Sequence, residues 1–237
     1  MNDREVFLRR FHAARPGITS SALGHTESYD RLIAAVPPAV RVLDLGCGDA
    51  HLVRRLGPRA IGLDLAPAPD RTAALVAGRA QAMPFADATF GACTCHLAFM
   101  LFDELDRVVA ELRRVARPGA VFAAVLGGGP TATGTPDDDA FHRFLALATP
   151  RGPGLGDPRA RSEAGWRALF DQPARFERFE LELSGAFDAV WRFLGASYQL
   201  AEADAPALRE QLRASYADAP RVPCRVVMWL ATVRLTR

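Results

Sequence analysis

Hydrophobic positions along this chain alternate between the spacing of strands and the spacing of helices. Short runs rich in Val, Ile and Leu at residues 40–45, 59–65 and 120–126 have the pattern of buried parallel strands. Residues 103–117 instead place Leu and Val on one helical stripe, with acids near its start, arginines near its end and Pro-Gly directly after it. This alternation predicts a parallel sheet with helices on both faces.

The rest of the chain continues the alternation, with one interruption after the strand at 120–126. There the segment GGGPTATGTPDDD, rich in glycine, proline and aspartate, predicts a flexible connection. The remaining predicted elements are helices at 5–13, 27–36, 140–148, 162–170, 187–200 and 206–217, and strands at 175–183 and 224–234.

The segment VRVLDLGCGDAH at residues 40–51 carries the strongest chemical signal in the chain. An apolar strand runs into Asp44-x-Gly46-x-Gly48, and residues with helical spacing follow at once. Glycine lets a backbone approach a ligand closely and adopt angles that other residues avoid, and the start of a helix offers unpaired N–H groups. A strand, a tight turn and a helix start in this order indicate a site for a nucleotide-like cofactor.

The residues around this turn distinguish between nucleotide cofactors. In the dinucleotide fingerprint G-x-G-x-x-G the third glycine would fall at His51, so a nicotinamide or flavin cofactor is disfavoured. Asp44, placed before the glycines, suits a ligand with an ammonium group and no pyrophosphate. Asp64 ends the strand at 59–65, where a carboxylate can accept hydrogen bonds from both hydroxyls of a ribose. S-adenosylmethionine has both of these groups.

Four segments together resemble class I S-adenosylmethionine-dependent methyltransferases. They are VLDLGCG, IGLDL, AQAMPFADATFGACTCHLAF and VVAELRRVARPGAVFAAV, within residues 40–125. The pattern is most similar to the small-molecule branch of the family, the type 11-like enzymes that include ubiquinone and menaquinone methyltransferases. The resemblance implies an α/β fold, with a Rossmann-like, doubly wound, seven-stranded and mostly parallel sheet, a helical N-terminal lid, and an insertion after the fifth strand.

We therefore expect one methyltransferase domain over residues 1–237. Its predicted parts are a helical lid at 1–38, a cofactor-binding core at 39–126, a helical insertion at 127–174, and C-terminal strands and helices at 175–237. The insertion is expected to cover the active site. The two late strands would complete one edge of the sheet.

The resemblance also implies the cofactor contacts, with S-adenosylmethionine as the methyl donor and S-adenosylhomocysteine as its product. The residues of the glycine turn line the methionine part, Asp64 binds the ribose, and Leu65 and residues 81–84 contact the adenine, while His96 lies near the methionine end. Carried over by position, the cofactor-binding residues are Asp44, Gly46, Cys47, Gly48, Asp64, Leu65, Gln81, Ala82, Met83 and His96.

Three positions depart from the family pattern. Arg79 stands where the family often has an acid that receives the adenine amino group, and Gln81 is the candidate substitute for that contact. Ala50 replaces a frequent third glycine, a small change that should spare binding. Gly91 stands where aspartate is common, so we expect the entrance of the fourth strand to differ.

Methyl transfer from a sulfonium requires mainly positioning, but an acceptor that must lose a proton also needs a base. His96 is the first candidate, because open α/β proteins bind ligands at the C-terminal edge of the sheet. The alternative is that His96 only lines the cofactor pocket. His12, His25 and His142 are further candidates on the segments expected near the substrate.

A set of mostly aromatic side chains could form the wall of an apolar substrate pocket. The candidates are Phe11, His12, Tyr29, Phe99, Met100, Trp191 and Tyr198. Aromatic residues at such spacings also build ordinary cores, so we expect roughly half of them to touch the substrate.

Neither the cysteines nor a run of three aspartates has the spacing of a metal site. Cys47, Cys93, Cys95 and Cys224 contain no C-x-x-C pair, and the middle two share one face of a strand, as core residues do. The aspartates at 137–139 directly precede a predicted helix, where carboxylates cap and solvate the first turn. No metal is predicted.

Composition sets further limits. The 237 residues are 49% hydrophobic, enough for the core of one large domain, and a net charge of +2 gives no bulk preference for nucleic acid. All 29 basic residues are arginine, which excludes a Schiff-base lysine. The start of the chain has no sustained apolar stretch, so we expect neither a signal peptide nor a membrane span, and a cytoplasmic protein.

The sequence thus predicts an enzyme that transfers a methyl group from S-adenosylmethionine to a small organic molecule, in specialised metabolism or on a quinone-like compound. One alternative is a cyclase or isomerase that binds the cofactor structurally and forms no S-adenosylhomocysteine. Another is a non-catalytic partner subunit, against which the intact glycine turn and Asp64 weigh. RNA methylation is disfavoured by the modest charge and the lack of a basic arm. The acceptor and the oligomeric state stay open.

Overall fold

The computed structural model of the chain is built on one sheet, and it describes residues 3–67, 70, 72–148, 156–196, 200, 204–217 and 219–236. The strands are β1 Val42–Leu45, β2 Ala60–Asp64, β3 Leu75–Ala77, β4 Phe90–His96, β5 Ala116–Pro130, β6 Arg175–Glu182 and β7 Arg225–Arg234. Their order across the sheet is β3-β2-β1-β4-β5-β7-β6, and only β7 runs antiparallel to its neighbours. The predicted seven-stranded, mostly parallel sheet is confirmed.

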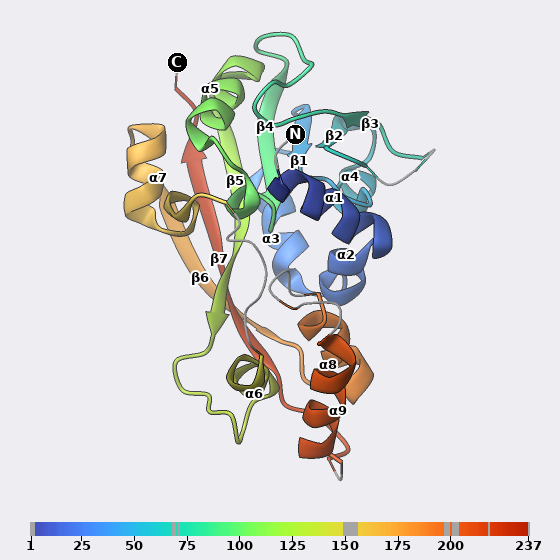
Figure 1. Cartoon of the computed structure of the whole chain (residues 1–237). Coiled ribbons are helices and arrows are strands. Elements are labelled where there is room, and N and C mark those ends of the chain that lie inside the picture. The colour runs from blue at the N-terminus through green and yellow to red at the C-terminus, as the bar shows by residue number, and fades with distance from the viewer. Residues whose placement is uncertain are drawn as a thin grey trace.

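Helices cover both faces of this sheet (Figure 1). They are α1 Asp3–Ala14, α2 Ile18–Leu23, α3 Glu27–Ala35, α4 His51–Leu56, α5 Leu105–Val115, α6 Ala140–Leu147, α7 Glu163–Phe170, α8 Phe187–Leu194 and α9 Ala205–Ser215. Successive side chains of β5 point to opposite faces of the sheet. Phe122 and Ala124 belong to the hydrophobic core on the face of α5 and α7, and Ala123 belongs to the core on the face of α3 and α4. The fold is therefore doubly wound.

The helical insertion contributes α7 to the core. Trp166 of α7 is fully buried and stacks on Phe122 of β5 with 5.4 Å between the ring centroids. Its indole Nε1–H donates to the Ala160 carbonyl oxygen at 2.8 Å, which satisfies the one polar atom of the ring. Helix α7 packs on the face of the sheet that also carries α5. That the insertion covers the active site stays a prediction.

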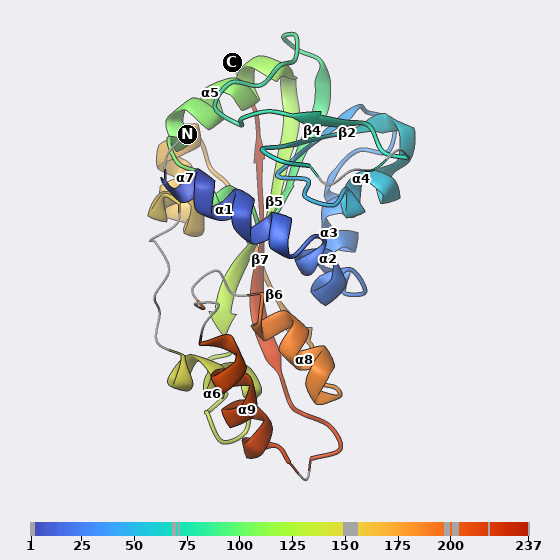
Figure 2. The same cartoon turned by 45° about the vertical axis from the view of Figure 1, so that its right-hand side comes forward.

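The strands β5, β7 and β6 extend beyond the parallel part of the sheet, and α6, α8 and α9 gather at their far ends (Figures 1 and 2). β5 runs from Ala116 to Pro130, more than twice the length of the predicted 120–126, and β7 pairs with it from Val121 to Pro130. A local irregularity in the pairing at Gly127 to Gly129 interrupts the register without ending the ladder.

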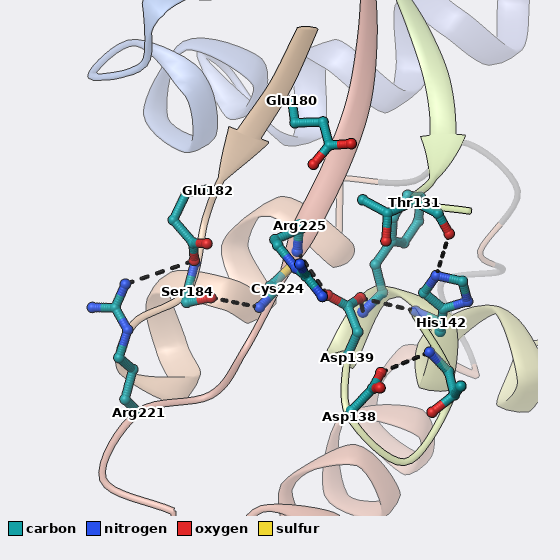
Figure 3. Close-up of polar contacts among 12 residues, drawn as sticks. Thr131, Asp138, Asp139, His142, Glu180, Glu182, Ser184, Arg221, Cys224 and Arg225 are labelled. Atoms are coloured by element: carbon teal, nitrogen blue, oxygen red, sulfur yellow. Dashed lines mark hydrogen bonds and ion pairs between the residues drawn. The ribbon is translucent and has the colours of Figure 1, made fainter. Parts of the chain in front are cut away.

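The predicted capping role of the aspartates before α6 is confirmed by the buried carboxylate of Asp139 (Figure 3). Its Oδ1 accepts from the backbone N–H groups of Phe141 at 2.9 Å and His142 at 3.3 Å. Its Oδ2 accepts from the backbone N–H of Arg225 at 2.9 Å. One side chain thus caps α6 and ties it to the first residue of β7.

Other differences from the predicted elements are local. The short elements α2 and β3 were not predicted, and α8 ends at Leu194 where the sequence predicted a helix to 200. Cys93 and Cys95 are fully buried in β4, which confirms their predicted packing role. Among the described residues, no helix is long and apolar enough to cross a membrane.

Candidate functional site

One cavity lies at the C-terminal ends of β1, β2 and β4. Leu45, Leu63 and His96 line it from the sheet, and Leu8 and Ile18 line it from the N-terminal helices. Both overall views show α1 crossing in front of the sheet at this level (Figures 1 and 2). The topology therefore brings the N-terminal helices, the predicted lid, to the edge of the sheet where open α/β folds bind ligands.

The glycine turn after β1 has the backbone geometry that its sequence implies. Gly46 has φ of 67° and Gly48 has φ of 52°, in the left-handed region that favours glycine. A Cβ on Gly46 would lie 2.4 Å from the Cβ of Ala98, whereas a Cβ on Gly48 would meet no atom within 4 Å. Because Gly48 also lines the cavity, its bare backbone faces open space where a ligand can approach.

Asp64 closes this turn from the end of β2. Its Oδ2 accepts from the Gly48 N–H at 3.0 Å, and its Oδ1 accepts from the Ala66 N–H at 2.9 Å. These bonds leave further lone pairs on both oxygens, since a carboxylate offers about four acceptor sites. Asp64 can therefore hold the turn and still accept hydrogen bonds from a diol in the cavity.

Asp44 is a buried carboxyl group on the floor of the cavity. Its side chain accepts from the Thr94 hydroxyl at 3.1 Å and is only 3% exposed. Burial raises the pKa of Asp44 to about 7, the hydrogen bond from Thr94 lowers it in part, and the nearby Asp64 and Asp49 carboxylates raise it further. A cationic group of a ligand would lower the pKa of Asp44 again, because an opposite charge favours the ionised carboxylate.

His96 ends β4 beneath the lid. Its ring stacks on Tyr29 of α3 with 3.8 Å between centroids, and its Nε2 shares a hydrogen bond with the Ser28 hydroxyl at 3.0 Å. Burial, with a smaller contribution from His51, lowers the pKa of His96 to about 3. The imidazole is therefore neutral and a weak proton acceptor at neutral pH. This arrangement favours the alternative that His96 lines the pocket, and its catalytic role stays a prediction.

The core of the chain, residues 43–124, matches the family described as a methyltransferase domain. The chain carries a class I S-adenosylmethionine-dependent methyltransferase domain. A solved structure of a putative type II methyltransferase from Anaeromyxobacter dehalogenans superposes on it with a TM-score of 0.59 at 26% identity, covering 88% of this chain and 95% of that one.

Two curated relatives are malonyl-[acyl-carrier protein] O-methyltransferases. The chain is 36% identical over 115 residues to that of Pectobacterium atrosepticum, covering 43% of this chain and 46% of the relative. It is 34% identical over 141 residues to that of Methylococcus capsulatus, covering 51% of each. The chain thus spans about half the length of the curated relatives it matches.

The residues of this methyltransferase domain fit its cofactor. The buried Asp44 carboxyl suits the ammonium of the methionine part, and the open backbone at Gly48 leaves room beside it. Eight of the ten residues predicted to bind the cofactor line the one cavity: Asp44, Gly46, Cys47, Gly48, Asp64, Leu65, Gln81 and His96. Ala82 and Met83 do not line it: Ala82 is exposed, and Met83 is buried with its N–H donating to Glu111.

Of the predicted substrate residues, His12 and Tyr29 line the cavity. Burial lowers the pKa of His12, and the charge of the nearby Asp64 carboxylate, which raises this pKa, is the smaller effect.

The other predicted substrate residues lie elsewhere in the described structure. Phe11 packs under Arg15, Phe99 is buried between Phe122 and Trp166, Met100 contacts Arg161, and Trp191 packs on Phe144. None of these four lines the cavity, because their aromatic and thioether groups pack locally. Tyr198 lies outside the described residues.

The remaining candidate bases lie away from the cavity. His142 is on α6, where its Nε2 bonds to the Thr131 carbonyl oxygen at 2.9 Å. His25 is exposed and does not line the cavity.

The three departures from the family pattern each have a local explanation. Ala50 has φ of 66°, so the backbone keeps the conformation that glycine favours and alanine occupies it at some strain. A Cβ on Gly91 would lie 2.6 Å from the Cβ of Val40, which excludes a larger residue there. Arg79 forms an ion pair with Glu5 of α1, with 2.6 Å between Nη2 and Oε1.

Several cavity residues were not predicted from the sequence. Glu5, Arg9 and Thr19 come from the N-terminal segment, and Asp49 and Asp103 come from the loops before α4 and α5. Their contacts join residues far apart in the chain, so no local spacing marks them. The arginine at position 79 was the one available signal, because an arginine in place of the family's usual acid indicates a carboxylate partner elsewhere in the chain.

The two turn glycines are expected to respond differently to alanine. Gly46→Ala combines a left-handed alanine with a Cβ overlap, so we expect the free energy of unfolding to fall by about 2–5 kcal/mol. Gly48→Ala should cost only about 1–2 kcal/mol but reduce affinity for S-adenosylmethionine by roughly tenfold, because its methyl enters the cavity. Urea denaturation and calorimetric titration measure the two effects, and identical profiles for both variants would contradict this division.

Proposed function

We propose that this protein transfers the methyl group of S-adenosylmethionine to a small organic acceptor. The observation that carries the proposal is the single cavity in which a buried carboxyl, an open glycine backbone and a strand-end carboxylate stand together. In the proposed arrangement Asp44 faces the ammonium, Asp64 binds the ribose, and Leu65 and Gln81 border the adenine. When bound, the cofactor supplies a sulfonium methyl group that is reactive toward nucleophiles.

The residues of the chain contribute mainly by holding the reactants in position. The turn at Gly46 and Gly48 holds the backbone close to the ligand, and the buried floor at Asp44 fixes one charged group. Leu8 and Ile18 of the N-terminal helices add apolar side chains to the wall of the cavity. Holding two reactants in a productive geometry can supply most of the rate enhancement of a displacement reaction.

We further propose that the acceptor atom is a carboxylate oxygen. Among the described residues, no group near the proposed methionine end is available as a base at neutral pH. Burial lowers the pKa of His96 to about 3, and by raising the pKa values of Tyr29 and Cys47 it keeps both of those groups protonated. Asp44 is assigned to the ammonium of the cofactor. A carboxylate is already ionised at neutral pH and needs no base. The curated relatives are named for O-methylation of a malonyl group on a carrier protein, which supports this acceptor class.

Transfer of tritium from methyl-labelled S-adenosylmethionine tests both levels of the proposal. The acceptors would be malonate, malonyl-coenzyme A, malonyl-acyl carrier protein and, as a control class, a set of phenols. We expect labelled product that releases volatile methanol in base, as a methyl ester does and an aryl ether does not. A base-stable product would overturn the carboxylate assignment alone. Cofactor binding with no S-adenosylhomocysteine formed on any acceptor would favour the cyclase or isomerase alternative.

Cofactor affinity is expected to depend on pH through Asp44. Its folded pKa of about 7 exceeds the ordinary value of 3.8, so the ligand-free fold loses stability through this group as pH rises between the two values. The ligand's ammonium stays charged below roughly pH 7.7 and favours ionised Asp44. We therefore expect the dissociation constant to decrease, by a slope approaching tenfold per unit, as pH rises from about 5.5 to about 7.

Calorimetric titrations with S-adenosylmethionine at half-unit pH steps measure this dependence. Asp44→Asn keeps the shape of the side chain and removes its titration, so its weaker binding should be flat over the same range. An unmodified protein with equally flat affinity would show that Asp44 does not face the ammonium.

A further inference from the structure

Helix α1 brings a buried carboxylate, Glu5, to one end of the cavity. Glu5 is 6% exposed and lines the cavity. Both of its oxygens are held by Arg79, with the Arg79 Nη1–H donating to Oε2 at 3.0 Å and Nη2 lying 2.6 Å from Oε1. Arg79 does not line the cavity, so it stands behind Glu5 and fixes the direction of the carboxylate.

The sheet order identifies which end of the cavity this is. Arg79 lies two residues after the end of β3, between Gly78 and Ala80, which both line the cavity. β3 lies on the far side of β2 from β1 and β4, where Asp44 and His96 stand. A ligand whose amino-acid part lies at β1 and β4 and whose ribose lies at Asp64 of β2 must place its base toward β3.

The chemistry of Glu5 matches that base. An adenine ring carries an exocyclic 6-amino group with two N–H donors, and a carboxylate is an acceptor-only group with about four lone-pair sites. Arg79 donates to both oxygens of Glu5, and the carboxylate borders the cavity, so a donor group that enters this end meets an acceptor. Gln81 lines the same end, but its amide Nε2–H donates to the Asp103 carbonyl oxygen at 2.9 Å, which directs this side chain toward the loop.

We propose that Glu5 accepts a hydrogen bond from the adenine 6-amino group, and that Arg79 is its positioning residue. This inference rests on the proposed placement of the cofactor. It assigns recognition of the adenine to the N-terminal helix. The protein can then recognise the adenine ring only while α1 is packed against the core. Position 79, where the family often has an acid, is an arginine in this chain. The Glu5 carboxylate that pairs with this arginine then supplies the acceptor from a different segment of the chain.

A pair of ligands tests this contact directly. The first is S-adenosylhomocysteine, and the second is its analogue with purine in place of adenine, which lacks only the 6-amino group. The unmodified protein is expected to bind the first about 10- to 100-fold more tightly by calorimetry, the range for a hydrogen bond to a charged group. Glu5→Ala should reduce this preference to about twofold or less and leave the affinity for the purine analogue nearly unchanged.

Further variants separate recognition from docking of the helix. Glu5→Gln keeps one carbonyl acceptor and should restore part of the preference, and Arg79→Ala should lose part of it. Asp3→Ala, an exposed acid on the same helix, should behave as the unmodified protein. If Glu5→Ala weakens both ligands equally and keeps the preference, Glu5 serves only to fasten α1 and the inference is overturned. Failure of the unmodified protein to bind either ligand would instead overturn the proposed function as well.

Discussion

Replacing Asp64 with alanine is expected to weaken S-adenosylmethionine binding by at least about 100-fold. The carboxylate accepts hydrogen bonds from the Gly48 and Ala66 backbone N–H groups, and we propose that it also accepts them from the ribose hydroxyls. Hydrogen bonds to a charged group contribute about 1.5–3 kcal/mol each, so losing the ribose contacts and the order of the turn together gives this magnitude. Calorimetric titration of the folded variant measures the loss.

Two further variants define what this result would mean. Asp64→Asn retains one acceptor oxygen and should fall between the alanine variant and the unmodified chain. Asp188→Ala removes an acid that is 70% exposed on α8, outside the cavity, and should leave affinity unchanged. Binding of the Asp64→Ala variant within threefold of the unmodified protein would place the ribose elsewhere and remove the basis for the proposed arrangement of the cofactor.

The parts of the site that the sequence predicted are those encoded within a few residues. The acid, the two glycines and the helix start lie within residues 44–51, so their spacing alone fixes a turn with an open backbone at Gly48. Asp64 could be placed because a strand end is a local feature and parallel strands bring their C-terminal ends together. The fold class followed for the same reason, since each strand and helix carries its own hydrophobic period.

The parts that the sequence did not predict depend on pairs that are distant in the chain. Glu5 and Arg79 are 74 residues apart, and Ser28 and His96 are 68 apart, so neither pair leaves a recognisable spacing. The helix at 163–170 was predicted as a helix, but its apolar face did not reveal that Trp166 would stack on Phe122 in the core. β3 was missed because three residues are too few to show a period.

The largest loss of stability is expected at the other end of the molecule, from Asp139→Ala. The buried carboxylate of Asp139 accepts from three backbone N–H groups, two in the first turn of α6 and that of Arg225 at the start of β7 (Figure 3). Each buried donor left without a partner costs about 1–3 kcal/mol, and loss of an N-cap costs about 0.5–2 kcal/mol. We expect the free energy of unfolding to fall by about 3–5 kcal/mol.

Urea denaturation followed by circular dichroism measures this effect, and the run of three aspartates contains its own control. Asp137→Ala removes a carboxylate that is 93% exposed and pairs with Arg143, so its cost should stay below about 0.5 kcal/mol. Asp139→Asn keeps one acceptor oxygen and should lose less than the alanine variant. Because no described residue of α6 or β7 lines the cavity, affinity for S-adenosylhomocysteine should persist in folded Asp139→Ala. Equal small losses at positions 137 and 139 would show that the buried carboxylate does not hold α6 to the sheet.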